Sequence, residues 1–212
     1  MFTVIPETGR SLALVIRHGR TALNKQGLLR AWADVPLDRT GELDAQMAAN
    51  ALRPYDPKIL YSSDLVRDMQ TVNIISTAFD NLTTEVDYGL RTADMGEWTE
   101  QPEEDVAPGV TDWYRFPWTM APSGESYDSF AARLYQFVDK KLELARDVPQ
   151  MCPVGMCSHG RIFAALDSRY NKRLPIDGRM AMPGGVGVIK QMPDGMLRFD
   201  FLGKTEDVVS DR

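Results

Sequence analysis

The sequence predicts an α/β protein with three layers, α/β/α, around a mostly parallel sheet. Apolar runs of strand length alternate with amphipathic helical segments along the chain, which is typical of this class. At 212 residues, with 43% hydrophobic and 25% charged residues, the chain is long enough to bury one full core. No repeat and no linker interrupts it, so we expect a single domain over residues 1–212.

The first half of the chain predicts three strands and two helices in alternation. Thr40 is a suitable N-cap for the first helix, and Pro54 ends it. In the second helix Leu65, Met69 and Val72 follow helical spacing on one face. The expected elements are a strand at 11–17, a helix at 41–53, a strand at 58–62, a helix at 64–79 and a short strand around 85–90.

The second half continues the same alternation and ends in a pair of strands. A long helix carries Phe130, Leu134 and Phe137 on one face, and a turn at residues 193–195 joins the last two strands. The expected elements are a helix at 126–146, a strand at 153–158, a helix at 160–170, and strands at 186–192 and 196–202.

The segment 99–122 interrupts this pattern. Its four prolines argue against a regular helix throughout, and four aromatic residues surround Arg115. We expect a cap-like insertion over the pocket, whose aromatic side chains select the organic part of a substrate. An insertion that only packs on the body of the domain fits the same residues.

His18 and His159 are the only histidines, and each is followed by glycine directly after a strand-like run. The carboxyl ends of parallel strands meet at one edge of a sheet, where ligands bind near helix N-termini. A neutral imidazole is a competent nucleophile toward phosphorus, and we assign this role to His18. Arg17 and Arg67 are candidates to hold the transferring phosphoryl group and to disfavour protonation of His18, and a charged His159 adds another donor.

Six blocks of sequence carry a family resemblance. They are residues 14–24 (LVIRHGRTALN), 36–41 (PLDRTG), 60–71 (LYSSDLVRDMQT), 90–98 (LRTADMGEW), 122–126 (PSGES) and 157–160 (CSHG). In this order they resemble the histidine phosphatase superfamily, the phosphoglycerate-mutase-like phosphohydrolases, over about residues 12–190. The resemblance implies a metal-independent phosphatase of phosphoglycerate-mutase-like fold that acts through a phosphohistidine.

The resemblance also implies individual roles. His18 is the phosphorylated residue, Arg17 and Arg67 clamp the phosphate, and His159 completes the pocket. By the resemblance, Asn24 and the main chain near Gly160 are also expected to bind phosphate. Other positions expected to contact a small phosphorylated substrate are Thr21 within the first block, Arg30 and Trp32 in the following loop, and Arg20, which adds positive charge at the mouth of the site.

One position departs from the family. The usual proton donor is a glutamate where this chain has Thr92, whose hydroxyl is far too weak an acid. Asp94 is the expected replacement, because period two in an extended segment places it on the same side as Thr92; Glu125 and Glu97 are further candidates. Alternatively, a substrate with a good leaving group needs no acid at all.

Composition excludes several classes of partner. A net charge of −6 and a pI near 5.0 argue against nonspecific nucleic-acid binding. No run reaches membrane-spanning length and residues 1–10 lack the pattern of a signal peptide, so we expect a cytoplasmic protein without membrane association. Cys152, Cys157 and His159 lie in a stretch typical of a buried strand, without the turn and fourth ligand of a zinc site, and alternation puts Cys152 on the opposite side; we expect reduced thiols and no metal or cofactor.

Two other functions fit these residues. A phosphoglycerate-type mutase uses the same nucleophile, but Thr92 and the lack of an extra basic segment count against it. A non-catalytic phospholigand-binding protein has the same pocket with turnover lost through Thr92. The nucleophile His18 disfavours this second hypothesis, since binding alone does not need it.

Overall fold

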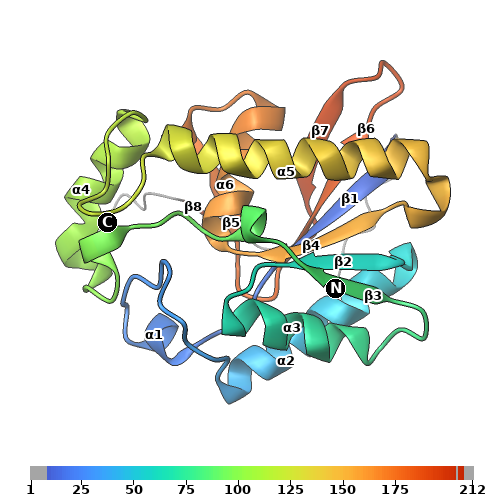
Figure 1. The fold of residues 1–212 in the computed structure, drawn as a ribbon, viewed down its shortest axis with the longest axis horizontal. Helices are drawn as coiled ribbons and strands as arrows, with labels where there is room; N and C mark the ends of the chain where they lie inside the picture. The colour runs from blue at the N-terminus through green and yellow to red at the C-terminus, as the bar shows by residue number, and fades with distance from the viewer. Residues whose placement is uncertain (1–8, 204, 208–212) are drawn as a thin grey trace.

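A six-stranded sheet forms the middle layer of the fold (Figure 1). The computed structural model describes residues 9–203 and 205–207. The first four strands of the chain pair in parallel. The next strand in the sheet pairs antiparallel with the first strand, and the last pairs antiparallel with that one, so the sheet is mixed and mostly parallel, as expected. In spatial order they are β3 (Thr83–Val86), β2 (Ile59–Ser62), β4 (Val154–Ser158), β1 (Arg10–Arg17), β6 (Val186–Gln191) and β7 (Leu197–Phe201).

Helices cover both faces of this sheet and complete the three layers (Figure 1). On one face lie α2 (Arg39–Leu52) and α3 (Val66–Ser76), and on the other α5 (Tyr127–Asp147) and α6 (Gly160–Asn171). Alternate residues of β1 enter different cores: Leu14 and Ile16 join the side of α2 and α3, whereas Ala13 and Val15 join the side of α5 and α6. Because both faces are covered, β1 is almost continuously apolar.

Helix starts depend on local capping. Helix α2 begins at Arg39 because the Asp38 carboxylate accepts a hydrogen bond from the Gly41 N–H at 2.8 Å, so the prediction of Thr40 as cap was wrong. The Ser126 hydroxyl caps α5. Over residues 9–203 and 205–207, no helix combines the length and apolar character needed to cross a membrane.

The strand expected around 85–90 ends at Val86. The Asp87 carboxylate accepts a hydrogen bond from the Gly89 N–H at 2.8 Å, which turns the chain into a helical turn, η2 (Tyr88–Leu90). The other short elements are α1 (Ala22–Lys25), η1 (Arg53–Tyr55), η3 (Gly96–Trp98), η4 (Pro149–Met151), η5 (Pro175–Asp177), and a small antiparallel pair of β5 (Arg179–Ala181) and β8 (Thr205–Asp207).

The segment 99–122 is not helical throughout, but it contains one helix that the prolines did not lead us to expect. Helix α4 (Glu103–Arg115) includes Pro108, which removes a backbone donor. Burial compensates, since Trp113 and Tyr114 are fully buried and pack on Tyr127 of α5 with ring centroids 5.3 and 5.6 Å apart. Helix α4 is therefore anchored to the body of the domain.

Candidate active site

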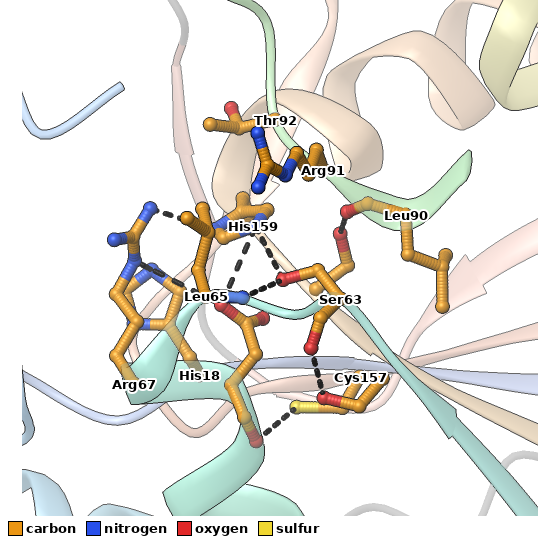
Figure 2. A network of polar contacts seen from close by, with 12 residues as sticks. His18, Ser63, Leu65, Arg67, Leu90, Arg91, Thr92, Cys157 and His159 are labelled. Atoms are coloured by element: carbon orange, nitrogen blue, oxygen red, sulfur yellow. Dashed lines mark hydrogen bonds and ion pairs between the residues drawn. The ribbon is translucent and has the colours of Figure 1, made fainter. Parts of the chain in front are cut away.

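Two neighbouring strands bring the histidines together. Strands β1 and β4 are parallel and in register, with Arg17 opposite Ser158, so the next residue of each leaves the same edge of the sheet. The His18 and His159 rings meet edge to face with centroids 5.2 Å apart (Figure 2). The two imidazoles thus share one buried polar site, as their positions after apolar runs led us to expect.

The hydrogen bonds of His18 fix which ring nitrogen carries the lone pair. Nδ1 donates to the Gly19 carbonyl at 2.7 Å, and Nε2 accepts from Nε of Arg67 at 3.3 Å. Burial, followed by the charges of Arg67 and Arg17, holds the pKa of His18 well below its ordinary value of 6.5. The ring is neutral at neutral pH, so Nε2 is unprotonated and can act as a nucleophile once substrate takes the Arg67 donor.

Arg67 is a fully buried cation at the centre of the site. Its Nη1 and Nη2 atoms donate to the carbonyl oxygens of Ala33 at 2.6 Å and Ala31 at 2.8 Å, which fixes the guanidinium plane. Nη2 also lies 3.3 Å from Nδ1 of His159. One rigid guanidinium therefore touches both imidazoles, in an arrangement suited to the equatorial oxygens of a phosphoryl group.

Arg17 supplies a second guanidinium, packed against the start of α6. Its Nη1 donates to the Ala181 carbonyl at 2.6 Å. A Cβ at Gly160 would lie 3.1 Å from Cζ of Arg17 and 2.9 Å from Sδ of Met180, so any other residue would require the Met180 side chain and this guanidinium to shift. Helix α6 begins at Gly160 with His159 as its N-cap, and the positive end of a helix favours an anion at this point.

Close backbone contact holds the loop that carries His18. A Cβ at Gly19 would lie 2.1 Å from the Gly41 carbonyl oxygen, and one at Gly41 would lie 2.1 Å from the Arg20 carbonyl oxygen. The Gly19 N–H also donates to Oγ1 of Thr71 at 3.2 Å. The loop is therefore fixed against both α2 and α3.

The residues expected to bind substrate differ in their partners. Oδ1 of Asn24 accepts hydrogen bonds from the N–H and Oγ1 of Thr21, both at 3.0 Å, which orients the amide donor of Asn24 away from Thr21. Arg20 does not point into the site. Its guanidinium binds both carboxylate oxygens of Asp44 on α2, at 3.0 and 3.1 Å, so its charge is balanced there.

Arg30 adds positive charge beside the histidines and joins their loop to α4. Its Nη1 lies 2.6 Å from Oε1 of Glu103. Burial lowers the pKa of Arg30 to about 10, Glu103 opposes this effect, and the nearby cations Arg17, Arg161 and Arg67 add to it. The cations of the site therefore extend beyond the pair that faces His18.

Thr92, at the position where the family has its acid, is buried, and Figure 2 labels it above His159 in this view. The carboxylates considered as replacements have other partners within the described residues. Oδ1 of Asp94 accepts from the Gly96 N–H at 3.0 Å, and Glu125 binds Arg133 at 2.8 Å and the Asp94 N–H. Glu97 accepts from the Ser123 hydroxyl. None of these hydrogen bonds reaches a histidine.

Asp68 was missed by our sequence reasoning. It is fully buried, and its Oδ2 lies 3.3 Å from Nε2 of His159 and 3.8 Å from Nε of Arg67. A usable signal was its place on the buried stripe of α3, three residues after Leu65 and four before Val72. A carboxyl group at such a position needs a partner, and here that partner is His159.

Both cysteines are free and lie on different sides of the sheet. Cys157 is buried with the core on the side of α2 and α3, and Cys152 packs against the other core. Across the part of the chain that the structure describes, no three His, Cys, Asp or Glu side chains gather as a metal site would require.

Comparison with known proteins identifies relatives along most of the chain. The family model of the histidine phosphatase superfamily (branch 1) matches residues 13–183. A glucosyl-3-phosphoglycerate phosphatase of Mycobacterium tuberculosis is 31% identical over 185 residues, covering 82% of this chain and 80% of the relative. A 2,3-bisphosphoglycerate-dependent phosphoglycerate mutase of Cytophaga hutchinsonii is 28% identical over 178 residues, covering 78% and 80%.

Solved structures agree with these relatives. The mycobacterial glucosyl-3-phosphoglycerate phosphatase in complex with VO3 superposes with a TM-score of 0.76 at 26% identity, covering 91% of this chain and 98% of that one. A second solved structure, mycobacterial hydrolase 2, gives a TM-score of 0.73 at 26% identity and covers 96% and 94%. The expected fold is confirmed by these neighbours.

Proposed function

Because the chain belongs to the histidine phosphatase superfamily, branch 1, we propose that it is a metal-independent phosphatase that forms a phosphohistidine on His18. The observation that carries the proposal is the state of His18: a neutral ring whose Nε2 lone pair faces the buried Arg67. A nucleophile beside fixed guanidinium donors has the arrangement that phosphoryl transfer requires.

The reaction proceeds in two displacements. Nε2 of His18 forms a bond to phosphorus while the bond between phosphorus and the leaving oxygen breaks, and Arg17 and Arg67 bind the charge on the equatorial oxygens. Water then attacks the phosphohistidine, the bond between phosphorus and Nε2 breaks, and inorganic phosphate leaves. The hydrogen bond from Nδ1 to Gly19 keeps the ring in position through both steps.

The substrate is proposed to be a small phosphorylated molecule with a second acidic group. The relatives are named for phosphoglycerates, which carry a carboxylate besides the phosphate. Arg30 and Arg161 extend the positive charge beyond the phosphate clamp. Binding of a second anion near them would relieve the repulsion among these cations.

A mutase is the second candidate, because one relative is named as a phosphoglycerate mutase. The two activities differ in the fate of the phosphoryl group. A phosphatase releases inorganic phosphate from 3-phosphoglycerate, whereas a mutase yields the 2-phospho isomer. Both products are measured in one reaction mixture, and the isomer in excess of free phosphate would favour the mutase.

The test compares wild type with His18→Asn on an aryl phosphate. Asparagine can still donate to the Gly19 carbonyl, so the loop is kept while the nucleophile is lost. We expect acid-labile phosphate to be trapped on wild type alone and hydrolysis to require His18. Equal hydrolysis by both proteins, with phosphate binding retained, would instead support the binding-protein hypothesis.

A further inference from the structure

The site contains a buried carboxyl group that the two displacements do not use. Asp68 lies on α3 next to Arg67 in sequence and is 0% exposed. A carboxyl group without access to water is costly unless it is paired or protonated. Its Oδ2 lies 3.3 Å from Nε2 of His159, so the partner is a ring that itself belongs to the site.

The His159 ring stands between Asp68 and the phosphate position. Nε2 faces Oδ2 of Asp68 and also Oγ of Ser63, each at 3.3 Å. Nδ1, on the other side of the ring, lies 3.3 Å from Nη2 of Arg67, the same guanidinium whose Nε reaches the nucleophile His18. A guanidinium nitrogen only donates, so Nδ1 accepts from Arg67 in the empty site. Once a phosphoryl oxygen takes this donor, the ring can carry its proton on Nδ1, toward the phosphoryl group, and accept the Asp68 proton at Nε2.

A proton delivered by His159 would replace the acid that this chain lacks at Thr92. An alkoxide leaves phosphorus slowly unless it is protonated, and the hydroxyl of Thr92 cannot supply a proton. Asp94, Glu125 and Glu97 are held by partners elsewhere, whereas Asp68 contacts a ring of the site directly.

We propose that Asp68, acting through the His159 ring, supplies the proton for the leaving oxygen in place of the family's glutamate. Asp68 is a positioning residue in this scheme, because His159 is the group that touches the substrate. The proposal rests on the proposed phosphatase function.

The proton transfers balance over the cycle. With substrate bound, Arg67 donates to the phosphoryl group and the neutral His159 ring carries its proton on Nδ1. As Nε2 of His18 binds phosphorus, the leaving oxygen takes the proton from Nδ1 of His159, and Nε2 of that ring takes the proton of the Asp68 carboxyl. The products are a free alcohol, a phosphohistidine, a neutral His159 and an ionised Asp68. When water attacks phosphorus, its proton passes to Nδ1 of His159, and Nε2 returns its proton to Asp68.

The charges around the pair agree with this direction of transfer. Burial raises the pKa of Asp68 to about 7, against the lowering effects of Arg67 and Ser63. Burial and the surrounding cations hold the pKa of His159 well below its ordinary value, so in the empty site the proton resides on Asp68. The charged and titratable groups that face the pair are Arg17 at the end of β1, His18 directly after it, Arg30 in the following loop, Asp64 and Arg67 of the α3 segment, and Cys157 of β4.

The experiment compares two substrates that differ in leaving group, p-nitrophenyl phosphate and glycerol phosphate, across four proteins. They are wild type, Asp68→Asn, the control Ser63→Ala and the double variant Asp68→Asn/Thr92→Glu. Asparagine keeps the shape of Asp68 without its proton, and Ser63→Ala removes an orienting contact to Nε2 of His159 without removing an acid. The value of kcat/KM is measured from pH 5 to 9.

We expect Asp68→Asn to lower kcat/KM on glycerol phosphate by about 100-fold or more, the usual effect of a general acid, and on the aryl phosphate by much less. The decrease in kcat/KM that wild type shows at alkaline pH should be absent from Asp68→Asn. Adding Thr92→Glu to this variant should restore part of its activity. Ser63→Ala should lower kcat/KM by the same factor on both substrates. An equal loss on both substrates by Asp68→Asn with an unchanged pH profile, or no loss at all, would overturn the proposal.

Two further measurements keep the outcomes separate. If His18→Asn remains active on both substrates, the phosphatase function fails regardless of Asp68. If Asp68→Asn does not fold, wild type alone decides: the rate ratio between aryl and alkyl phosphates should widen as the pH rises through about 7. A ratio that stays constant with pH would contradict proton donation by Asp68.

Discussion

Acidification from pH 6 to pH 5 should lower the free energy of unfolding by an amount that His18, His159 and Asp68 control. The folded pKa of each histidine lies well below 6.5, so its contribution to stability is present above pH 6.5 and is lost as the pH falls. Asp68 acts in the opposite sense. Its folded pKa of about 7 exceeds the ordinary 3.8, so its contribution is full at low pH and is lost as the pH rises toward 7.

The magnitude follows from counting protons in this window. The unfolded chain binds more protons at each histidine than the folded chain, by at most one, and each full proton changes stability by about 1.4 kcal/mol per pH unit. The folded chain binds about one more proton at Asp68, which cancels one histidine. The three groups together therefore lower the free energy of unfolding by at most about 1.4 kcal/mol between pH 6 and pH 5.

Two variants shift this slope in opposite directions. Asp68→Asn removes the contribution of Asp68 that opposes the two histidines. Its free energy of unfolding should therefore fall more steeply between pH 6 and pH 5 than that of wild type, by about 1.4 kcal/mol per pH unit. His18→Asn removes one histidine, so its free energy of unfolding should fall less steeply with acidification than that of wild type, by at most this amount. Urea unfolding curves at pH 5.0, 5.5 and 6.0 give the three slopes, and the contributions of all other carboxylates cancel in the differences.

The signs of the two differences test the reasoning. If both variants have the slope of wild type, the histidines and Asp68 titrate in the folded chain as they do in the unfolded one, and the assignment of a neutral His18 is wrong. A slope in Asp68→Asn equal to that of wild type would mean that Asp68 is ionised in the folded chain throughout this range.

Two predictions concern substrate binding. Gly160→Ala places a Cβ 3.1 Å from Cζ of Arg17, so kcat/KM on p-nitrophenyl phosphate should fall about tenfold, equivalent to about 1.4 kcal/mol of transition-state stabilisation. Calorimetry should show a small change in Tm, and full activity would mean that Arg17 need not hold this position. Arg30→Met should raise KM for 3-phosphoglycerate more than for p-nitrophenyl phosphate; equal increases would count against a second acidic group near Arg30.

The histidines could be located from the sequence because the relevant signal is local. Each follows a buried strand whose length is visible as an apolar run, and parallel pairing then places Arg17 opposite Ser158. Arg67 could be predicted from its motif and from helical spacing in α3. These inferences need only the direction of the strands and the period of the helix.

The remaining features depend on contacts between distant segments. Asp38 and Thr40 are both suitable caps, and only the folded loop decides that Asp38 binds the Gly41 N–H. Arg20 was expected at the mouth of the site, but its guanidinium is held by Asp44, 24 residues away in sequence. Asp68 is hidden for the same reason, since its partner His159 belongs to a strand end more than 90 residues later.

The contact between Gly19 and Gly41 gives a residue without reactive groups control over the nucleophile. Any side chain at Gly41 would collide with the Arg20 main chain, so the loop would have to shift away from α2 and carry the His18 ring with it. In a saturation mutagenesis screen scored by turnover, Gly41 should therefore rank with the imidazoles, although it never meets a phosphate oxygen. A map of tolerated substitutions should therefore show low tolerance at this backbone contact as well as at the residues that bind the phosphoryl group.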